Sequence, residues 1–509
     1  MSPTSRSPLA VSIASLVVLL CGCSCARGQA TGAPRYRIEW ATFLGGDQWD
    51  QAREVIVYPD GSVLVGAQSN SVGMPVSEGA VQPRYAGDDP ALGHGGIYGG
   101  DCYLARLSPD GRRVLAATYF GGSKQERNVY GMALDRDGNV VITSATRSPD
   151  VPTTEGSFQP KYGGPPSDCY VAKLSPDLKQ ARWCTYVGGS GDDFPRGGLG
   201  LDEDDNVYVV GTTASANFPV TAGVLQRSPK GGRDATIVKL RPDGSGVLFA
   251  TLLGGNAEDG IMGVRTDGDR NIHVGGHTQS SDFPVTPGAP QTALGGESDC
   301  FLAKLSGDGS KLIYATYLGG RANEFAEHRL CLAPDGSALL TGVTASPDFP
   351  TTPNAFQRAL KGRNDGFLTR LSADGNRFVF STLLGGSGTE FYLMPTLDPS
   401  GNILVVGTTS SADFPVTPDA VQTAYGGGGD GGDGVLAILS PDGSKLLYAT
   451  YLGGSGEDLI RSLALGPNGE VYLVGNTSST DFPVTAGALQ TRIGGGPADA
   501  FVVKLTPAE

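Results

Sequence analysis

The chain contains little charge and few histidines. Only 18% of its 509 residues are Asp, Glu, Lys or Arg, against about 25% in typical soluble domains, and only four are His. The net charge is -14 and there is no long basic run, which argues against nucleic acid or an anionic membrane as a partner bound through charge. The chain also lacks a Gly-x-Ser-x-Gly elbow, a metalloprotease helix and a phosphate-binding loop. Catalysis would therefore need an acid pair or a cation site.

Long hydrophobic runs are absent after residue 20. The run from Leu9 to Leu20 follows Arg6 and has the length of a signal-peptide core, too short to span a bilayer as a helix. We therefore expect residues 1–30 to direct export to the periplasm, the cell surface or the medium. Cleavage after Ala30 is one option. The other is cleavage before Cys23, in a stretch similar to a bacterial lipobox, with a lipid on Cys23 anchoring the protein to a membrane.

Cysteines are few and isolated in the body of the chain. Five of the eight lie after the export segment, each alone inside an apolar, strand-like run, and no CxxC zinc pattern occurs there. An exported protein permits disulfides, but this pattern favours small buried thiols.

Glycine, in contrast, is abundant: 77 of 509 residues, about 15% against a usual 7%. The glycines follow no three-residue period, which excludes collagen. Instead, a Gly-Gly pair recurs at spacings of 76, 67, 66, 65, 66 and 68 residues. Its seven copies begin at Gly45, Gly121, Gly188, Gly254, Gly319, Gly385 and Gly453. We expect residues 31–509 to form one domain of seven repeats.

Each repeat reads as four short strands. Gly, Pro and Asp-Gly turns recur about every ten residues, which leaves no room for ordinary helices and favours antiparallel hairpins. Runs such as Val207 to Val210 carry apolar residues at successive positions, so both faces of each sheet need a neighbour. A closed ring of sheets satisfies every member, whereas an open row would expose two apolar faces. The sequence predicts an all-β, seven-bladed β-propeller.

The chain ends predict how the ring closes. Residues 36–43 match the fourth strand of a repeat, without the first three before it, and residues 501–505 match a third strand. If the first strand pairs beside the last, both ends of the chain complete one blade through hydrogen bonds.

Several segments resemble a known repeat family. Leu447 to Gly454, Asp413 to Thr417 and Asp499 to Leu505 are similar to the bacterial seven-bladed β-propeller repeat called SBBP. The resemblance extends over residues 36–505. It implies an exported or surface-associated bacterial protein and supplies no catalytic motif. The first two repeats depart from its Asp-Phe-Pro element, with Met74-Pro75 and Val151-Pro152.

An acidic residue follows each Gly-Gly pair by four positions. The seven are Asp50, Glu126, Asp193, Asp259, Glu324, Glu390 and Asp458. In the usual propeller order they would lie near the central channel, where seven carboxylates could hold a cation such as Ca²⁺ or attract a basic partner. The other interpretation is structural, because a feature present in every blade usually serves the blade, for example by accepting hydrogen bonds from loop N–H groups.

Two more polar positions recur in every repeat, and we interpret both as structural. An Asp precedes each third strand at Asp101, Asp168, Asp234, Asp299, Asp365, Asp433 and Asp499. A Gln lies upstream of it at Gln82, Gln159, Gln226, Gln291, Gln357, Gln422 and Gln490.

Departures from the repeat are candidates for binding, because a site for one ligand should break the symmetry of its scaffold. From Gln to Asp the seven repeats span 19, 9, 8, 8, 8, 11 and 9 residues. The insertion in the first repeat is a candidate recognition loop, and a tolerated surface insertion is the alternative. Its candidate residues are Tyr85, Asp88, Asp89, His94 and Tyr98.

These features favour an exported, non-catalytic, monomeric module that recognises a protein or glycan, with no nucleic-acid partner and no resident cofactor. The alternative is a divalent-cation-dependent extracellular enzyme acting on polysaccharide or a similar substrate at an acidic channel mouth. Fold alone does not decide between the two.

Overall fold

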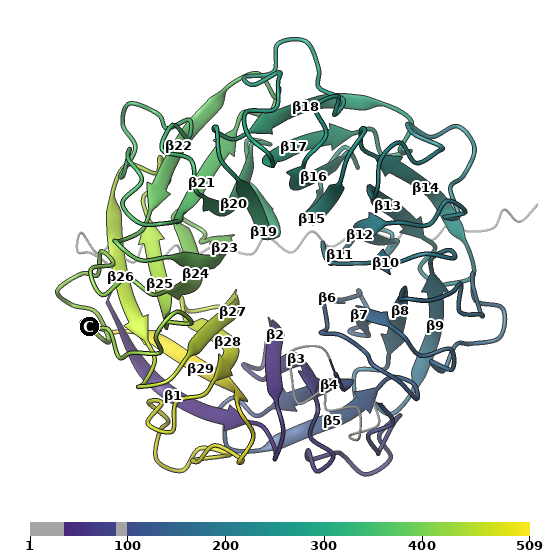
Figure 1. Cartoon of the computed structure of the whole chain (residues 1–509). Helices are drawn as coiled ribbons and strands as arrows, with labels where there is room; N and C mark the ends of the chain where they lie inside the picture. The colour runs from purple at the N-terminus through teal and green to yellow at the C-terminus, as the bar shows by residue number, and fades with distance from the viewer. Residues whose placement is uncertain (1–34, 88–98, 509) are drawn as a thin grey trace, which may run out of the picture. The chain divides into compact units, whose positions relative to one another are not determined.

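The computed structural model describes residues 35–87 and 99–508, which form 29 β-strands and no helix. The strands make seven antiparallel sheets arranged around a central channel (Figure 1). The predicted seven-bladed propeller is confirmed. Within these ranges no helix is long and apolar enough to cross a membrane.

The strands form four concentric layers, and each blade contributes one strand to each layer. In blade 3 the innermost strand is broken in two. The innermost strands are β2 (Asp50–Val57), β6 (Gly131–Leu134), β10 (Asp193–Phe194) with β11 (Leu199–Leu201), β15 (Asp259–Thr266), β19 (Glu324–Leu332), β23 (Glu390–Leu397) and β27 (Asp458–Leu465). The second strands are β3 (Val63–Ser69), β7 (Val140–Thr146), β12 (Val207–Thr213), β16 (Ile272–Thr278), β20 (Ala338–Thr344), β24 (Ile403–Thr409) and β28 (Val471–Thr477).

The two outer layers complete the blades, numbered 1 to 7 from β2 onward. The third strands are β4 (Asp101–Leu107), β8 (Asp168–Leu174), β13 (Asp234–Leu240), β17 (Asp299–Leu305), β21 (Asp365–Leu371), β25 (Asp433–Leu439) and β29 (Asp499–Pro507). The outermost strands are β5 (Val114–Phe120), β9 (Ala181–Val187), β14 (Val247–Leu253), β18 (Leu312–Leu318), β22 (Phe378–Leu384), β26 (Leu446–Leu452) and, in blade 7, β1 (Tyr36–Leu44).

Blade 7 is built from both ends of the chain. Its strand order is β27-β28-β29-β1, and β1 pairs antiparallel with β29 from Tyr36 opposite Pro507 to Leu44 opposite Ala500. The N-terminal strand therefore occupies the fourth position of the last blade, as the sequence predicts, and its hydrogen bonds cover the edge of β29.

The core lies between blades rather than inside one layer. Seven hydrophobic clusters are found in the described residues, and each joins two neighbouring blades. One of them joins Trp40 and Tyr472 of blade 7 to Tyr103 and Tyr119 of blade 1. Both faces of each sheet are thus buried, which is why the strands carry consecutive apolar residues instead of alternating ones. The five body cysteines are unpaired, and four of them are buried in these strands.

The innermost strands are less regular than the others. The pairing register shifts around Arg53 in β2, around Met262 in β15 and around Arg461 in β27. Larger interruptions occur at residues 327–329 of β19 and 392–393 of β23, and residues 195–198 separate β10 from β11. A β-bulge turns a side chain away from the regular alternation. Irregularity is therefore concentrated at the channel.

Candidate functional site in the central channel

The seven acidic residues that follow the Gly-Gly pairs are buried in the loops. Each has at most 2% of its surface exposed. In blade 7, the Asp458 carboxylate accepts hydrogen bonds from the Gly454 N–H at 2.8 Å and the Ser479 hydroxyl at 2.8 Å. Equivalent bonds reach Asp50 from Gly46 and Ser71, both at 2.7 Å. This geometry matches the structural interpretation: the carboxylate fastens the loop that enters each blade.

Each of these carboxylates has an acidic neighbour from the preceding blade. The neighbour is the Asp that begins a third strand, and the pairs are Asp499 with Asp50, Asp101 with Glu126, Asp168 with Asp193, Asp234 with Asp259, Asp299 with Glu324, Asp365 with Glu390 and Asp433 with Asp458. The first glycine of the Gly-Gly pair lies between them. At Gly319 a Cβ would overlap both the Glu324 and the Asp299 carboxylates. That steric conflict accounts for the invariant glycine.

Burial dominates the ionisation of these acids. It raises the pKa of Asp50 and Asp458 to about 6 and that of Glu390 to about 7, and the negative neighbour adds to the shift of Glu390. Burial also raises the pKa of Glu126 well above its ordinary value, with repulsion from Asp101 second. At Asp50, Asp458 and Glu390, burial therefore favours the protonated carboxyl group at mildly acid pH.

The recurrent Gln and Asp also serve the scaffold. In blade 4, Gln291 Nε2 donates to Asp299 at 2.7 Å, and its Oε1 accepts from the Gly319 N–H at 2.9 Å. The same Gln–Asp bond occurs in blades 1, 3, 5, 6 and 7. These side chains tie a long loop to the Gly-Gly turn and satisfy its backbone groups.

The candidate recognition loop falls largely outside the described residues. Of its five residues only Tyr85 is described; its ring packs edge-on against Tyr119 at 5.8 Å between centroids. Asp88, Asp89, His94 and Tyr98 lie outside the described ranges, as does Cys23. The recognition role of this loop and the lipid on Cys23 stay predictions.

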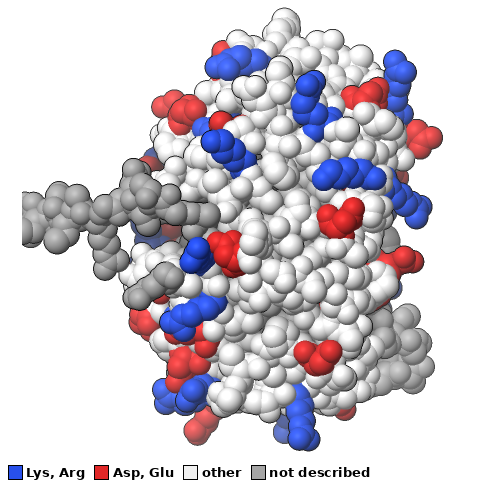
Figure 2. Space-filling model, turned by 90° about the vertical axis from the view of Figure 1, so that its left-hand side faces the viewer, with Lys and Arg blue, Asp and Glu red and all other residues white. Residues whose placement is uncertain are grey.

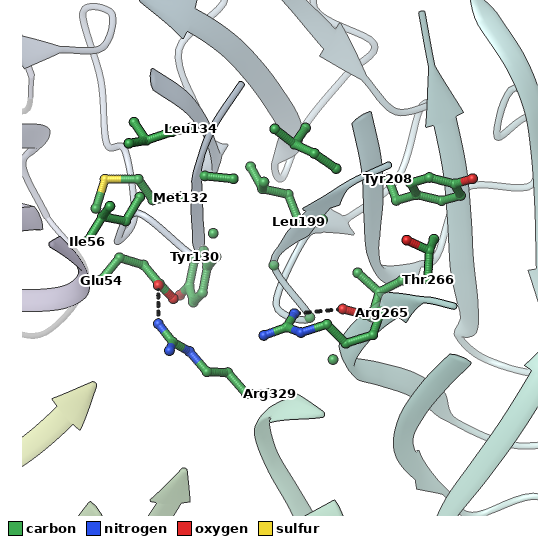
Figure 3. A pocket seen from close by; sticks show the side chains of 18 of the residues that line it. Glu54, Ile56, Tyr130, Met132, Leu134, Leu199, Tyr208, Arg265, Thr266 and Arg329 are labelled. Atoms are coloured by element: carbon green, nitrogen blue, oxygen red, sulfur yellow. Dashed lines mark hydrogen bonds and ion pairs between the residues drawn. The ribbon is translucent and has the colours of Figure 1, made fainter. Parts of the chain in front are cut away.

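One cavity of about 440 Å³ lies between the innermost strands of blades 1 to 5. Its lining is a mixture of backbone glycines, aliphatic side chains and two arginines (Figure 3). Arg329 is tightly held: its Nη2 lies 2.6 Å from Glu54 and 2.8 Å from the Ser462 hydroxyl. Arg265 Nη1 donates to the Val264 carbonyl at 2.8 Å. These guanidinium groups connect one blade to another or brace their own strand.

A second cavity, of about 360 Å³, shares Tyr130 with the first and has a different character. Four arginines from blades 1, 2, 3 and 7 line it, together with Trp49, Tyr130, Phe194, Tyr392 and Asn128. We call it the arginine pocket, defined by Arg53, Arg127, Arg196 and Arg461 with these five side chains. The arginine pocket is a cluster of positive side chains in a protein whose net charge is -14.

Aromatic rings hold the four guanidinium groups in place. Arg461 lies 3.6 Å from the Tyr392 ring centroid, Arg53 lies 4.7 Å from that of Tyr130, and Arg127 lies 4.7 Å from that of Phe194. Arg196 lies 5.0 Å from the ring centroid of Phe325. Stacking of this kind orients a planar guanidinium, with its N–H groups at the edge of the plane.

The arginines repel one another. Burial lowers the pKa of Arg53 to about 10, and the neighbouring charges of Arg461 and Arg196 contribute to that shift. Glu327, buried beside them, has its pKa raised by burial, an effect that Arg196, Arg461 and Arg53 partly oppose. Glu457 at the rim of the pocket is exposed. Two carboxylates thus face four guanidinium groups.

The aligned repeats contain a signal for this pocket that the loop lengths do not carry. The third residue after each recurrent acid is Arg53, Val129, Arg196, Met262, Glu327, Leu393 or Arg461. This position holds Arg in three repeats, an apolar residue in three and Glu in one, so four of its seven occupants are charged. It coincides with the irregular part of each innermost strand, where the side chain turns toward the channel.

Other titratable groups are accounted for locally. His273 lies 3.1 Å from Asp267 and 3.2 Å from the Tyr314 hydroxyl, whereas His277, four residues later on β16, stacks on Phe325 at 4.3 Å. The two imidazoles thus have separate partners. In the part of the chain that the structure describes, no group of three or more His, Cys, Asp or Glu side chains is arranged to hold a metal ion.

Known proteins resemble the chain to different degrees. No curated protein matches the chain. Among solved structures, a protein of unknown function from Dyadobacter fermentans matches at 13% identity with a TM-score of 0.42, covering 93% of this chain and 100% of its own. BamB from Moraxella catarrhalis matches at 11% identity with a TM-score of 0.39, covering 92% of this chain and 100% of its own.

A europium-containing methanol dehydrogenase matches at 12% identity with a TM-score of 0.40, covering 92% of this chain and 93% of its own. Similarity at this level says nothing about ligand or activity. The family model for the SBBP beta-propeller repeat matches residues 182–219. The chain is therefore a seven-bladed β-propeller that carries an SBBP repeat.

Proposed function

We propose that this protein is an exported recognition module whose ligand enters the central channel at the arginine pocket. The observation that carries the proposal is the break in sevenfold symmetry at the channel, where one repeat position holds Arg53, Arg196 and Arg461 in three blades, an apolar side chain in three others and a glutamate in the remaining one. The fold and the SBBP repeat are compatible with a binding or scaffold module.

The recurrent carboxylates do not favour the cation-dependent enzyme. That alternative needs several carboxylates directed at one ion or substrate in the channel. Each of the seven is instead buried in its own blade, and Asp458, Asp50 and their equivalents accept hydrogen bonds from the Gly-Gly loop. We therefore advance the binding function alone.

The distribution of charge on the outer surface of the ring also supports a ligand site in the channel. On the side shown in Figure 2, acidic and basic side chains are scattered between wide uncharged areas and form no patch of one sign. Charge of one sign inside a narrow opening focuses potential and raises the local concentration of an oppositely charged ligand.

A binding screen tests this function. Mature protein is applied to immobilised cell-wall glycans and cell-surface proteins, beside Arg461→Met and a variant lacking residues 88–96. We expect saturable capture that Arg461→Met reduces at least tenfold. The matched control is Arg106→Met, because Arg106 also stacks on a tyrosine, at 3.9 Å, but pairs with Asp60 away from the channel. Absence of capture from every class, or capture unaffected by Arg461→Met, would contradict the proposal.

Export is tested separately. We expect the mature N-terminus to lie at Thr31, or at Cys23 with the mass of an attached lipid. Cell fractionation with intact-mass spectrometry distinguishes the two. An unprocessed N-terminus in the cytoplasmic fraction would contradict export.

A further inference from the structure

The four arginines of the arginine pocket lie on irregular inner strands of different blades, and no single element of secondary structure brings them together. Arg53 belongs to β2 and Arg461 to β27, which are adjacent because the ring closes. Arg127 precedes β6, and Arg196 lies between β10 and β11. The ring places these four at one cavity together with Asn128.

Arg461 has hydrogen-bonding capacity that the protein leaves unused. Its side chain lines the cavity, only 6% of its surface is exposed, and its Nη1 has no hydrogen-bond partner. Asn128 lines the same cavity, and its buried Oδ1 also has no partner. A carboxylate or phosphate oxygen placed at this N–H would accept a charge-assisted hydrogen bond, which is about twice as strong as a neutral one.

We infer that the arginine pocket is a binding site for oxyanion groups and takes a small ligand with two or more carboxylates or phosphates. This inference rests on the proposed function and specifies its ligand chemistry. Guanidinium groups stacked on rings present their edges, and two parallel N–H donors match the two oxygens of a carboxylate or phosphate. The Asn128 oxygen fits a hydroxyl donor on the same ligand.

The charges of the side chains around the pocket indicate whether the ligand is an anion or a cation. Four arginines and one glutamate, Glu457, line the pocket, and Glu327 lies close to three of these arginines, so positive side chains outnumber negative ones there. An anionic ligand reduces the repulsion among the arginines, whereas a cation would add to it. The volume of about 360 Å³ lies at the small end of ligand pockets, which suits a small molecule or the end of a chain such as an acidic sugar.

Calorimetry and thermal unfolding of the mature protein test the inference. The probes are citrate, pyrophosphate and digalacturonate, each compared with sodium chloride at the same ionic strength and pH. We expect at least one probe to bind saturably and raise the melting temperature beyond the chloride control. Preference for citrate or digalacturonate identifies a carboxylate ligand, and preference for pyrophosphate a phosphate ligand.

Arg461→Met is the decisive variant. It keeps the apolar stem over Tyr392 and removes one of four mutually repelling charges. We therefore expect it to melt no lower than the wild type without ligand and to bind the probe at least tenfold more weakly. A purely structural Arg461 would give the opposite pattern, a lower melting temperature with unchanged binding. Arg106→Met, the control, should keep full affinity.

If Arg461→Met fails to fold, Arg461→Lys replaces it. Lys keeps the positive charge but lacks the two parallel N–H donors of a guanidinium group. We therefore expect it to bind the probe about three- to tenfold more weakly, with the same dependence on ionic strength. Equal stabilisation by chloride and by every probe, or unchanged affinity in the variants, would overturn the inference.

The two proposals fail in different ways. Capture of a macromolecule that is indifferent to citrate, pyrophosphate and Arg461→Met leaves a recognition module but removes the oxyanion site. Probe binding lost in Arg461→Met, with no macromolecule captured, leaves the oxyanion site but removes the recognition function. Preferential binding of an acidic peptide such as oligoglutamate over all three probes would also overturn the choice of a small ligand.

Discussion

The loops that enter the blades and the channel that the blades enclose are built from adjacent residues but follow opposite rules. In the loops, the Gly-Gly pair, the acid four residues later and the Ser or Thr that binds it recur in all seven blades. In the channel, three residues beyond each acid, the side chain is Arg in three blades, apolar in three and Glu in one. Repetition here marks what every blade needs to fold, and variation marks the place where one ligand would be recognised.

The largest effect on stability is expected from removal of residues 35–43. This deletion takes away most of β1, exposes the edge of β29 and removes Trp40 from the cluster between blades 7 and 1. We expect loss of cooperative unfolding, measured by circular dichroism and calorimetry. An unchanged melting curve would mean that the seven blades do not depend on this strand.

A large effect is also expected from one loop carboxylate. Asp458→Ala leaves the Gly454 N–H and the Ser479 hydroxyl without their acceptor in a buried loop. We expect the free energy of unfolding to fall by about 2–4 kcal/mol, because each buried donor without a partner costs about 1–3 kcal/mol. Denaturant titration measures it. A change below about 0.5 kcal/mol would show that the loop does not need its carboxylate.

The pH dependence of stability should come from the loops and not from the channel. Burial raises the pKa of Asp50, Asp259 and Asp458 to about 6 and that of Asp499 to about 7, above the value near 4 in an unfolded chain. The folded protein therefore binds more protons than the unfolded one between about pH 4 and pH 7. Stability should be highest near the acid end of that window and fall as the pH rises through it.

Melting temperatures from pH 4.5 to 8 check this sign. Carboxylates whose pKa is lowered, such as Asp267 beside Lys304, lose their contribution only below about pH 4. Burial lowers the pKa of His277 to about 3, so this one imidazole acts with the opposite sign below about pH 6.5 and is outweighed by the several carboxyl groups. Asp458→Asn removes one titrating group and should flatten the curve, whereas Arg461→Met should leave its slope unchanged. A melting temperature that rises with pH across the window would contradict this assignment.

The smallest effect on stability is expected from a substitution at the rim of the arginine pocket. Glu457→Gln removes an exposed negative charge from the arginine pocket without touching a loop carboxylate. We expect the unfolding free energy to change by less than about 0.5 kcal/mol and the affinity for citrate or pyrophosphate to rise about two- to threefold. Calorimetry at low and high salt measures the gain, which should shrink as salt screens the charge.

Most of the fold could be predicted from the repeat itself. The seven Gly-Gly pairs, the turns every ten residues and the two-faced apolar strands lead to seven four-stranded blades, and the unmatched strand at residues 36–43 leads to the shared last blade. The repeat pattern does not predict the split of the innermost strand of blade 3 into β10 and β11. Pro195 and the two glycines after Arg196 interrupt the pairing there, and no neighbouring repeat carries that signal.

The candidate site was only partly predictable. The sequence indicates that symmetry breaking should mark binding, but loop length directs attention to the insertion around Asp88 and away from the inner strands. The acids that follow the Gly-Gly pairs could equally face the channel or the loop, because a position on a strand end does not say which way a side chain turns. Their hydrogen bonds to Ser71, Ser479 and the equivalent residues decide that question.

The sequence by itself therefore determined the number of blades, their strand order and the pairing of the first strand with the last. These features follow from local periodicity and from the need to bury both faces of every sheet. Only the tertiary structure decided which side chains meet in the middle. Arg53 and Arg461 are 408 positions apart and become neighbours because the ring closes, and each turns toward the channel because its strand bulges there. Local patterns encode the blades, whereas the pocket is a property of their arrangement around one axis.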